Sequence, residues 1–212
     1  MAKAISFTLV SIFLFSMLSG CIGIGNKFVE YDIDDANQVW DQYDEHYYIK
    51  RTPASNASIG VADKLINNNE IYLLRYWDSF VYDEDELDWS EDPFDDWTWQ
   101  FYYHSLRMVS YLINAYELTG DTLYLEKSKW FIESWIEHNP SPSNQSSERA
   151  WDDHSTANRI TTFIYFWDHY RNSQIFDDEF GNELLNMLRK HGEYTAKKSN
   201  YLWGHNHGIY QD

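Results

Sequence analysis

The stretch WQFYYHSLRMVSYLINAYELTGDTLYLEKSKWFIESWIEHNP, residues 99–140, decides the fold class. Apolar residues recur through it at helical spacing. Gly120 is well placed to end a first helix in the left-handed conformation, and Asp121 is placed to cap a second helix over residues 122–138. Asn139-Pro140 then stops the second helix. The stretch therefore predicts a helix hairpin.

Similar patterns continue on both sides of this hairpin. A Ser/Pro/Asn-rich loop at 141–150 precedes further helices that are expected at 155–171, at 178–198 and from about His207 onward. The preceding residues predict a mixed segment, with helices near 32–50 and 58–68 and strand-like content at 71–83. Because short connections make consecutive helices antiparallel, the sequence predicts an all-α fold of antiparallel helix hairpins behind a mixed N-terminal segment.

The first twenty residues read as an export signal. Lys3 precedes an apolar run at 5–18 that is too short to span a membrane as a mature helix. The following LSGC, residues 18–21, resembles the lipobox of prokaryotic lipoproteins, in which cleavage leaves Cys21 as the acylated N-terminus. This predicts a protein outside the cytoplasm, periplasmic or at the cell surface, anchored in a membrane by lipid. An ordinary signal peptide or an uncleaved anchor is the alternative.

The charge of the chain limits its partners. With 34 acidic and 16 basic residues, the formal net charge is −18. This balance argues against nucleic acid, which needs a basic surface. An acidic substrate would have to be held by a local positive site, although a salt-rich habitat would also explain the acidity. Ten Trp and seventeen Tyr residues favour a helical core or surfaces that stack on sugars.

Three polar and aromatic clusters are expected at one end of the helices. The antiparallel order places the starts of the first, third and fifth of these helices at the same end. Their leading segments are DDWTWQ at 95–100, WDDHS at 151–155 and GHNHG at 204–208. Helix caps explain the Asp, Ser and Asn residues but not the Trp and His residues. The clusters therefore predict a binding cleft.

Four motifs carry a family resemblance. They are ADKLINN at 62–68, LDWSEDPFDDWTWQF at 87–101, WDDHSTANR at 151–159 and HNHGIYQ at 205–211. In this order, with helices between them, they resemble the heparinase II/III-like polysaccharide lyases, which include alginate lyases. The resemblance implies an incomplete α/α toroid that opens onto a cleft and is followed by a β-sandwich domain.

The resemblance also predicts how the chain is organised. The expected parts are a lipoprotein signal peptide at 1–20, the lipidated cysteine and a tether at 21–27, the N-terminal segment at 28–95, and a truncated toroid domain at 96–212. The chain is then expected to be an N-terminal fragment of a lyase, inactive by itself. The catalytic tyrosine of the family is expected beyond residue 212.

The family reaction is β-elimination at a uronic acid, and the last motif suits it. The Asn206 amide donates hydrogen bonds without carrying charge, and an unperturbed histidine such as His207 titrates near ~6.5. A helix N-terminus there would favour an anion, and Gly204 and Gly208 would permit close approach. By resemblance, Asn206 would neutralise the substrate carboxylate and His207 would share in proton transfer.

Other residues are candidates for binding the acidic polysaccharide. They are His154, Arg159, Trp151, His205, Trp97, Trp99 and Gln100. For Arg159 the alternative is a structural salt bridge to Asp152 or Asp153, and for the tryptophans it is core packing. Structural roles are expected for His104, His138, His169 and His191.

No cofactor or metal is expected. His205 and His207, aided by Asp153 and His154, are alternative metal ligands, but a spacing of two is poor on a helix and no further cysteine is available. Two other functions stay open. One is a toroidal glycoside hydrolase using Asp152 and Asp153, or the acids at 83–88, as paired carboxylates. The other is a non-catalytic surface lipoprotein that binds glycans.

Overall fold

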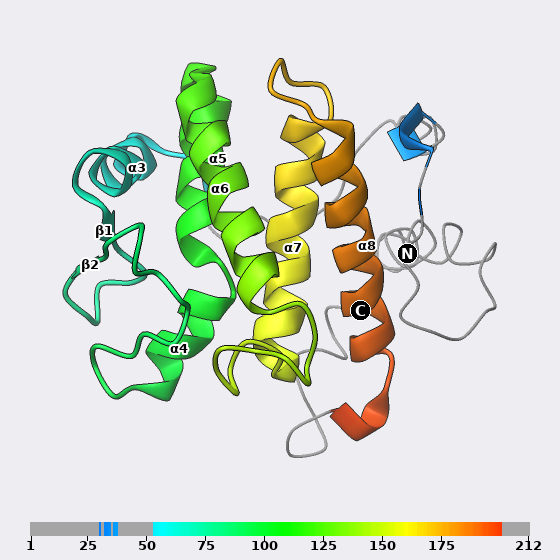
Figure 1. Cartoon of the computed structure of the whole chain (residues 1–212). Coiled ribbons are helices and arrows are strands. Elements are labelled where there is room, and N and C mark those ends of the chain that lie inside the picture. Colours follow the sequence, from blue (N-terminus) through cyan, green and yellow to red (C-terminus); the bar gives the residue numbers. More distant parts are fainter. Residues whose placement is uncertain (1–29, 31, 35, 38–52, 201–212) are drawn as a thin grey trace, which may run out of the picture.

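The computed structural model describes residues 30, 32–34, 36–37 and 53–200. Its elements in chain order are α3 (Asn56–Asn68), β1 (Glu70–Ile71), β2 (Phe80–Val81), α4 (Trp97–His104), α5 (Arg107–Thr119), α6 (Thr122–His138), α7 (Asp153–Tyr170), α8 (Asp178–Thr195) and the 3-10 helix η1 (Lys198–Asn200). Figure 1 shows α5, α6, α7 and α8 side by side, with α3 and the two strands beside α5 and with α4 at the lower end. The predicted all-α class is confirmed for this part of the chain.

The predicted helix ends are confirmed around the first hairpin. Gly120 ends α5 with a left-handed φ of 72°, and the side chain of Asp121 accepts a hydrogen bond from the Leu123 amide at 3.0 Å. Asn139 ends α6 at the predicted position, before Pro140. These ends depend on local backbone chemistry, which is why the sequence reveals them.

The helix predicted over residues 99–120 is wrong in one respect, because it breaks into α4 and α5. Leu106 adopts a left-handed conformation with φ 55° and ψ 41°. That conformation costs a non-glycine residue roughly 1–2 kcal/mol. Complete burial of the Leu106 side chain contributes about 1.5–3 kcal/mol, which is enough to offset the cost.

The N-terminal segment differs from its prediction in detail. The strand-like stretch at 71–83 forms only two short antiparallel strands, in which Glu70 pairs with Val81 and Ile71 with Phe80. The helix predicted at 58–68 is confirmed as α3 and begins earlier, at Asn56. Of the helix predicted at 32–50, positions 33–34 and 36–37 are helical, and most of the remainder lies outside the described residues.

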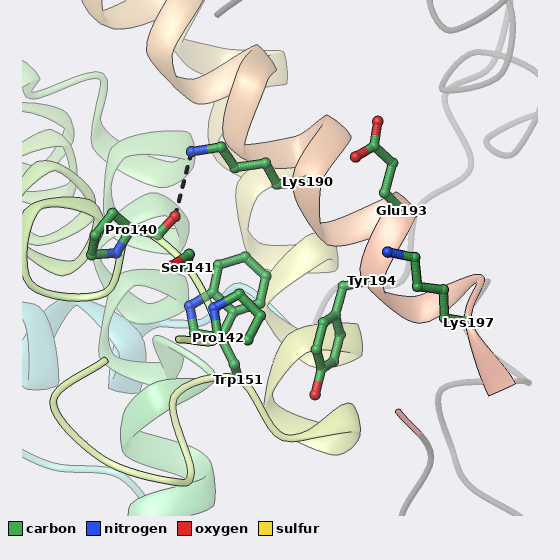
Figure 2. A pocket seen from close by; sticks show the side chains of 8 residues that line it. All are labelled: Pro140, Ser141, Pro142, Trp151, Lys190, Glu193, Tyr194 and Lys197. Atoms are coloured by element: carbon green, nitrogen blue, oxygen red, sulfur yellow. Dashed lines mark hydrogen bonds between the residues drawn. The ribbon is translucent and has the colours of Figure 1, made fainter. Parts of the chain in front are cut away.

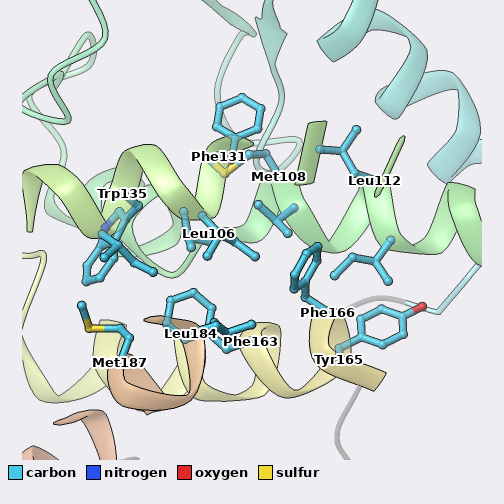
Figure 3. Packing of buried hydrophobic residues seen from close by; sticks show 14 of the residues in the cluster. Leu106, Met108, Leu112, Phe131, Trp135, Phe163, Tyr165, Phe166, Leu184 and Met187 are labelled. Carbon is cyan, nitrogen blue, oxygen red and sulfur yellow. The ribbon is translucent and has the colours of Figure 1, made fainter. Parts of the chain in front are cut away.

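One hydrophobic core joins the N-terminal segment to the helices. Trp89 stacks on Tyr103 with ring centroids 4.9 Å apart, and Tyr103 stacks on Trp99 at 4.7 Å. Figure 3 shows how the core continues between the longer helices, where Phe163 lies beside Leu184 and its ring centroid is 6.3 Å from that of Trp135. Residues on both sides of position 95 thus share a core, and the boundary expected there stays a prediction. Among the described helices, none combines the length and apolar character needed to cross a membrane.

Candidate functional site

The first two predicted clusters meet at the lower end of the helices in Figure 1. Helix α4 lies against the start of α7, where the rings of Phe101 and His154 are 5.8 Å apart. The third cluster, at 204–208, lies outside the described residues, and so do His205, Asn206 and His207. The predicted roles of these three residues stay predictions.

An arginine connects the starts of α4 and α7. The guanidinium carbon of Arg149 lies 3.5 Å from the centroid of the Trp97 ring. Its Nη1 atom also donates to the carboxylate of Asp152 at 3.1 Å, and Asp152 caps α7 by accepting from the Ser155 amide at 2.6 Å. Trp97 is nonetheless 70% exposed. The result is an open aromatic face next to a positive charge.

Two further side chains lie near the starts of α4 and α7. The Oε1 atom of Gln100 accepts a hydrogen bond from the Ser147 hydroxyl at 3.3 Å, and His154 is partly exposed. We call Trp97, Gln100, Arg149 and His154 the rim. Arg149 was missed by the sequence analysis, because it lies in a loop rich in Ser and Pro. The sequence did offer one indication of a binding residue: Arg149 is a single basic residue next to the acidic residues of WDD at 151–153.

Asp96 fixes the start of α4. Its carboxylate accepts from the amides of Thr98 and Trp99 and, at 3.0 Å, from the indole N–H of Trp77. Burial raises the pKa of Asp96, but these hydrogen bonds outweigh it, so the pKa is lowered from its ordinary value. The cap therefore stays ionised and keeps Trp97, the next residue, in place.

Trp99 belongs to the core. Its side chain is 1% exposed and stacks on Tyr103. Of the two roles that the sequence left open for Trp99, the structure supports core packing and not sugar stacking.

Arg159 is also internal, contrary to its predicted role as a substrate contact. It has no exposed surface. Its Nε atom donates to Nε2 of His191 at 2.8 Å, and its Nη1 atom donates to the carbonyl of His104 at 2.6 Å. Its guanidinium carbon lies 3.7 Å from the centroid of the Trp135 ring. A guanidinium held in this way joins α7 to α8 and to the end of α4, and it has no access to a polymer in solvent.

The histidines around Arg159 are neutral. Burial, and then the charge of Arg159, lower the pKa of His104 to about 3 and hold the pKa of His191 well below its ordinary value. The Nδ1–H group of His191 donates to the Met187 carbonyl at 2.7 Å, while Nε2 accepts from Arg159. Both nitrogens are therefore in use, and the structural roles expected for His104 and His191 agree with this geometry.

A pocket of about 360 Å³ opens beside the rim, between the loop after α6 and the last turns of α8. Figure 2 shows its lining: Pro140, Ser141, Pro142, Trp151, Lys190, Glu193, Tyr194 and Lys197. The predicted stacking residue Trp151 lies on its wall but is only 2% exposed. Lys190, Tyr194 and Lys197 were missed, because their positions on a predicted amphipathic helix gave no sign of a site.

His205 and His207, the two main ligands of the alternative metal site, lie outside the described residues. Within the described ranges, no three His, Cys, Asp or Glu side chains are close enough together to hold an ion.

Comparisons with known proteins bear on both fold and family. The family model for the heparinase II/III N-terminus matches residues 26–211. No curated protein matches the sequence. One similar solved structure is a mutant of the heparan sulfate lyase HepC from Pedobacter heparinus, with a TM-score of 0.66 at 19% identity over 84% of this chain and 30% of that one.

A second structure of HepC from Pedobacter heparinus gives a TM-score of 0.65 at 16% identity, over 97% of this chain and 29% of that one. At such identities the likeness shows the fold alone. The chain spans about three-tenths of the length of these lyases. The predicted fold class, an incomplete α/α toroid of antiparallel helix hairpins, is thereby confirmed. Because the family model covers most of the sequence, this chain belongs to the heparinase II/III N-terminal family.

Proposed function

We propose that the protein is a polysaccharide lyase that cleaves a uronate-containing polysaccharide by β-elimination, with this chain as its helical part. Membership of the heparinase II/III N-terminal family supports a lyase. The similar solved structures are of a heparan sulfate lyase, so an acidic polysaccharide is the substrate class that we propose here.

The rim is the observation that carries the proposal. Trp97 offers an exposed ring, and the partly buried guanidinium of Arg149, which also pairs with Asp152, lies 3.5 Å from the centroid of that ring. An aromatic face suits a sugar ring, and a guanidinium suits a carboxylate or sulfate. A chain with a net charge of −18 must hold an acidic polymer by a local arrangement of this kind.

The proposed reaction needs three groups around one uronate. A base takes the C5 proton, the electron pair left behind forms the C4–C5 double bond, and the C4–O bond breaks while the leaving oxygen gains a proton. Charge develops on the carboxylate, so donors fixed around it contribute much of the rate. We propose Asn206 for this neutralisation and His207 for proton transfer, as the family resemblance predicts.

The neighbouring carboxylates of Asp152 and Asp153 do not suit hydrolysis. Asp152 is already engaged by Ser155 and Arg149, and Asp153, 1% exposed, accepts from the His154 amide at 2.9 Å. Both acids thus serve the start of α7. A hydrolase needs two carboxyl groups that face each other across a sugar, about 5–9.5 Å apart. Asp152 and Asp153 are instead engaged in capping α7 and in hydrogen bonds to neighbouring groups, so they do not form such a pair.

We also propose that the protein is exported and anchored by lipid at Cys21. The apolar run at 5–18 and the small residues before Cys21 support this proposal. Such an anchor would hold the enzyme at a membrane surface, in contact with extracellular polymer.

The test uses the protein purified from its source cells and a panel of uronate polymers. Elimination gives unsaturated uronate ends, which absorb in the near ultraviolet, in step with new reducing ends. New reducing ends without that absorbance would refute elimination in favour of hydrolysis. Binding without any cleavage across the panel would refute the enzyme and favour a glycan-binding lipoprotein.

A further inference from the structure

We infer that the pocket lined by Trp151, Lys190, Tyr194 and Lys197 is a subsite for an acidic sugar residue, with the two lysines holding its carboxylate or sulfate. The inference rests on the proposed function for the class of ligand. It adds a second place where the protein contacts an anionic group of the polymer, at the C-terminal end of α8 and just after it.

The aromatic wall of the pocket is held rigidly. The indole N–H of Trp151 donates to the Asn139 carbonyl at 3.0 Å, and its ring lies 4.5 Å from the His191 ring and 5.5 Å from the Tyr194 ring. The volume of about 360 Å³ is within the range of roughly 300–1,000 Å³ that small-molecule sites occupy. A rigid aromatic wall loses little entropy when a ligand binds.

The charges in the pocket favour an anion. Its one acid, Glu193, is paired with Arg189 at 2.6 Å. Within the described residues, neither Lys190 nor Lys197 forms a salt bridge. Lys190 interacts electrostatically with the Glu183 carboxylate on α8. In the described part of the chain, the two lysines therefore give the pocket a net positive charge once Glu193 is paired with Arg189. Figure 2 shows Lys190 reaching toward Pro140 at one end of the pocket and Lys197 at the other end, next to Tyr194.

A structural role for the lysines makes a different prediction. Basic residues are common near helix C-termini, because they interact with the last carbonyls and with the dipole. Here the Nζ atom of Lys190 reaches the Pro140 carbonyl only at 3.4 Å, which is a long hydrogen bond. A structural role would appear as a loss of stability, and a subsite would appear as a loss of affinity for charged sugar.

The rim and the pocket draw residues from the same loop, the one between α6 and α7. Trp151 immediately precedes Asp152, whose carboxylate pairs with the Arg149 that lies against Trp97. In the inferred arrangement, one acidic polymer contacts Trp97 and Arg149 with one sugar and the pocket with another. We therefore expect the site to prefer oligosaccharides over single sugars.

The experiment compares two double variants of the protein purified as the full chain. Lys190→Gln with Lys197→Gln removes the pocket cations. Lys64→Gln with Lys129→Gln removes two lysines elsewhere, which pair with Glu70 and Glu133, and so matches the change in net charge. Calorimetry measures binding of a uronate tetrasaccharide and of the same tetrasaccharide with its carboxyl groups reduced to alcohols.

We expect the pocket variant to bind the acidic tetrasaccharide at least about tenfold more weakly than the wild type, since two charge-assisted hydrogen bonds are lost even after solvent screening. Its affinity for the reduced tetrasaccharide should not change, and the matched variant should bind both as the wild type does. An equal loss in both double variants would overturn the inference, because it would show an effect of net charge. So would unchanged affinity in the pocket variant, with or without a lower melting temperature.

These outcomes separate the subsite from the proposed function. If the wild type forms unsaturated products and the pocket variant keeps its affinity and KM, the subsite is refuted and the lyase stands. If affinity depends on the two lysines but no uronate polymer gives an unsaturated product, the subsite stands and the lyase is refuted.

Discussion

The Nη1 atom of Arg159 donates a 2.6 Å hydrogen bond to the backbone carbonyl of His104, the last residue of α4. The helix break at Leu106 leaves this carbonyl and that of Ser105 without the partners that a continuous helix would supply. Thr162 donates to the Ser105 carbonyl at 3.2 Å. Two side chains of α7 thus satisfy the end of α4, which places Arg159 in the core rather than in the substrate cleft.

Replacing Arg159 should therefore affect stability. We expect Arg159→Met to lower the free energy of unfolding by about 3–5 kcal/mol, because it leaves buried carbonyl and imidazole groups without their charged partner. Urea denaturation measures the change. As a control, Arg75→Met removes an exposed arginine and should cost no more than about 0.5 kcal/mol. Equal stability of the two variants would contradict the structural role.

Acid should destabilise the protein through its buried histidines. The pKa of His104 is about 3 in the folded chain, against an ordinary value of 6.5, and that of His191 is also lowered. Below pH 6.5 the unfolded chain therefore binds protons that the folded chain does not. Stability falls as the pH falls through this window, by up to about 1.4 kcal/mol per pH unit for each histidine.

The His191→Gln variant tests this effect, since its amide oxygen can accept from Arg159 and does not titrate. We expect the slope of unfolding free energy against pH, measured below pH 6.5, to be shallower than that of the wild type by up to about 1.4 kcal/mol per unit. Parallel curves for the two proteins would exclude His191 as a source of acid sensitivity.

The exposed ring of the rim should matter for binding and little for folding. We expect Trp97→Ala to weaken binding of an acidic polysaccharide about tenfold, as truncation of a central tryptophan typically does. The unfolding free energy should fall by only about 0.5–1 kcal/mol, which is the value of an exposed cation–π contact. Calorimetry and urea denaturation measure the two effects. Leu123→Ala, a half-exposed residue at the start of α6, is the control and should leave binding unchanged.

The predicted catalytic pair should act on rate. With the intact protein, Asn206→Ala and His207→Ala should each lower kcat for elimination at least about a hundredfold, in line with the loss of an oxyanion donor or a general acid or base. The near-ultraviolet absorbance of unsaturated ends follows the rate. His138→Ala, on α6, is a matched control and should keep full activity. Activity that survives in the His207 variant would assign proton transfer to another residue.

The lipid anchor is tested by labelling. Cells that make the wild-type protein and are fed a tagged fatty acid should yield a labelled, membrane-bound protein. Cys21→Ser should abolish the label, because the thiol is the acceptor. A label that persists in the variant, or a wild type that takes up none, would rule out this anchor.

The sequence by itself determined the helix ends around the first hairpin and the family. Gly120 and Asp121 act on the backbone within a few residues of themselves, so their effect is visible without a structure. The four motifs likewise predicted the family that the comparison over residues 26–211 shows. The starts of α4 and α7 were placed together correctly because short connections leave little choice of topology.

Only the tertiary structure decided the rest. At the break before Leu106, Arg159 donates to a carbonyl 55 residues away, and the neutral state of His191 depends on burial and then on the same arginine, 32 residues away. The pocket cations lie on a helix whose sequence predicts only packing. Each of these features arises from burial and from contacts between segments that are distant in the sequence. The local sequence does not indicate which distant group will supply a hydrogen bond or a charge.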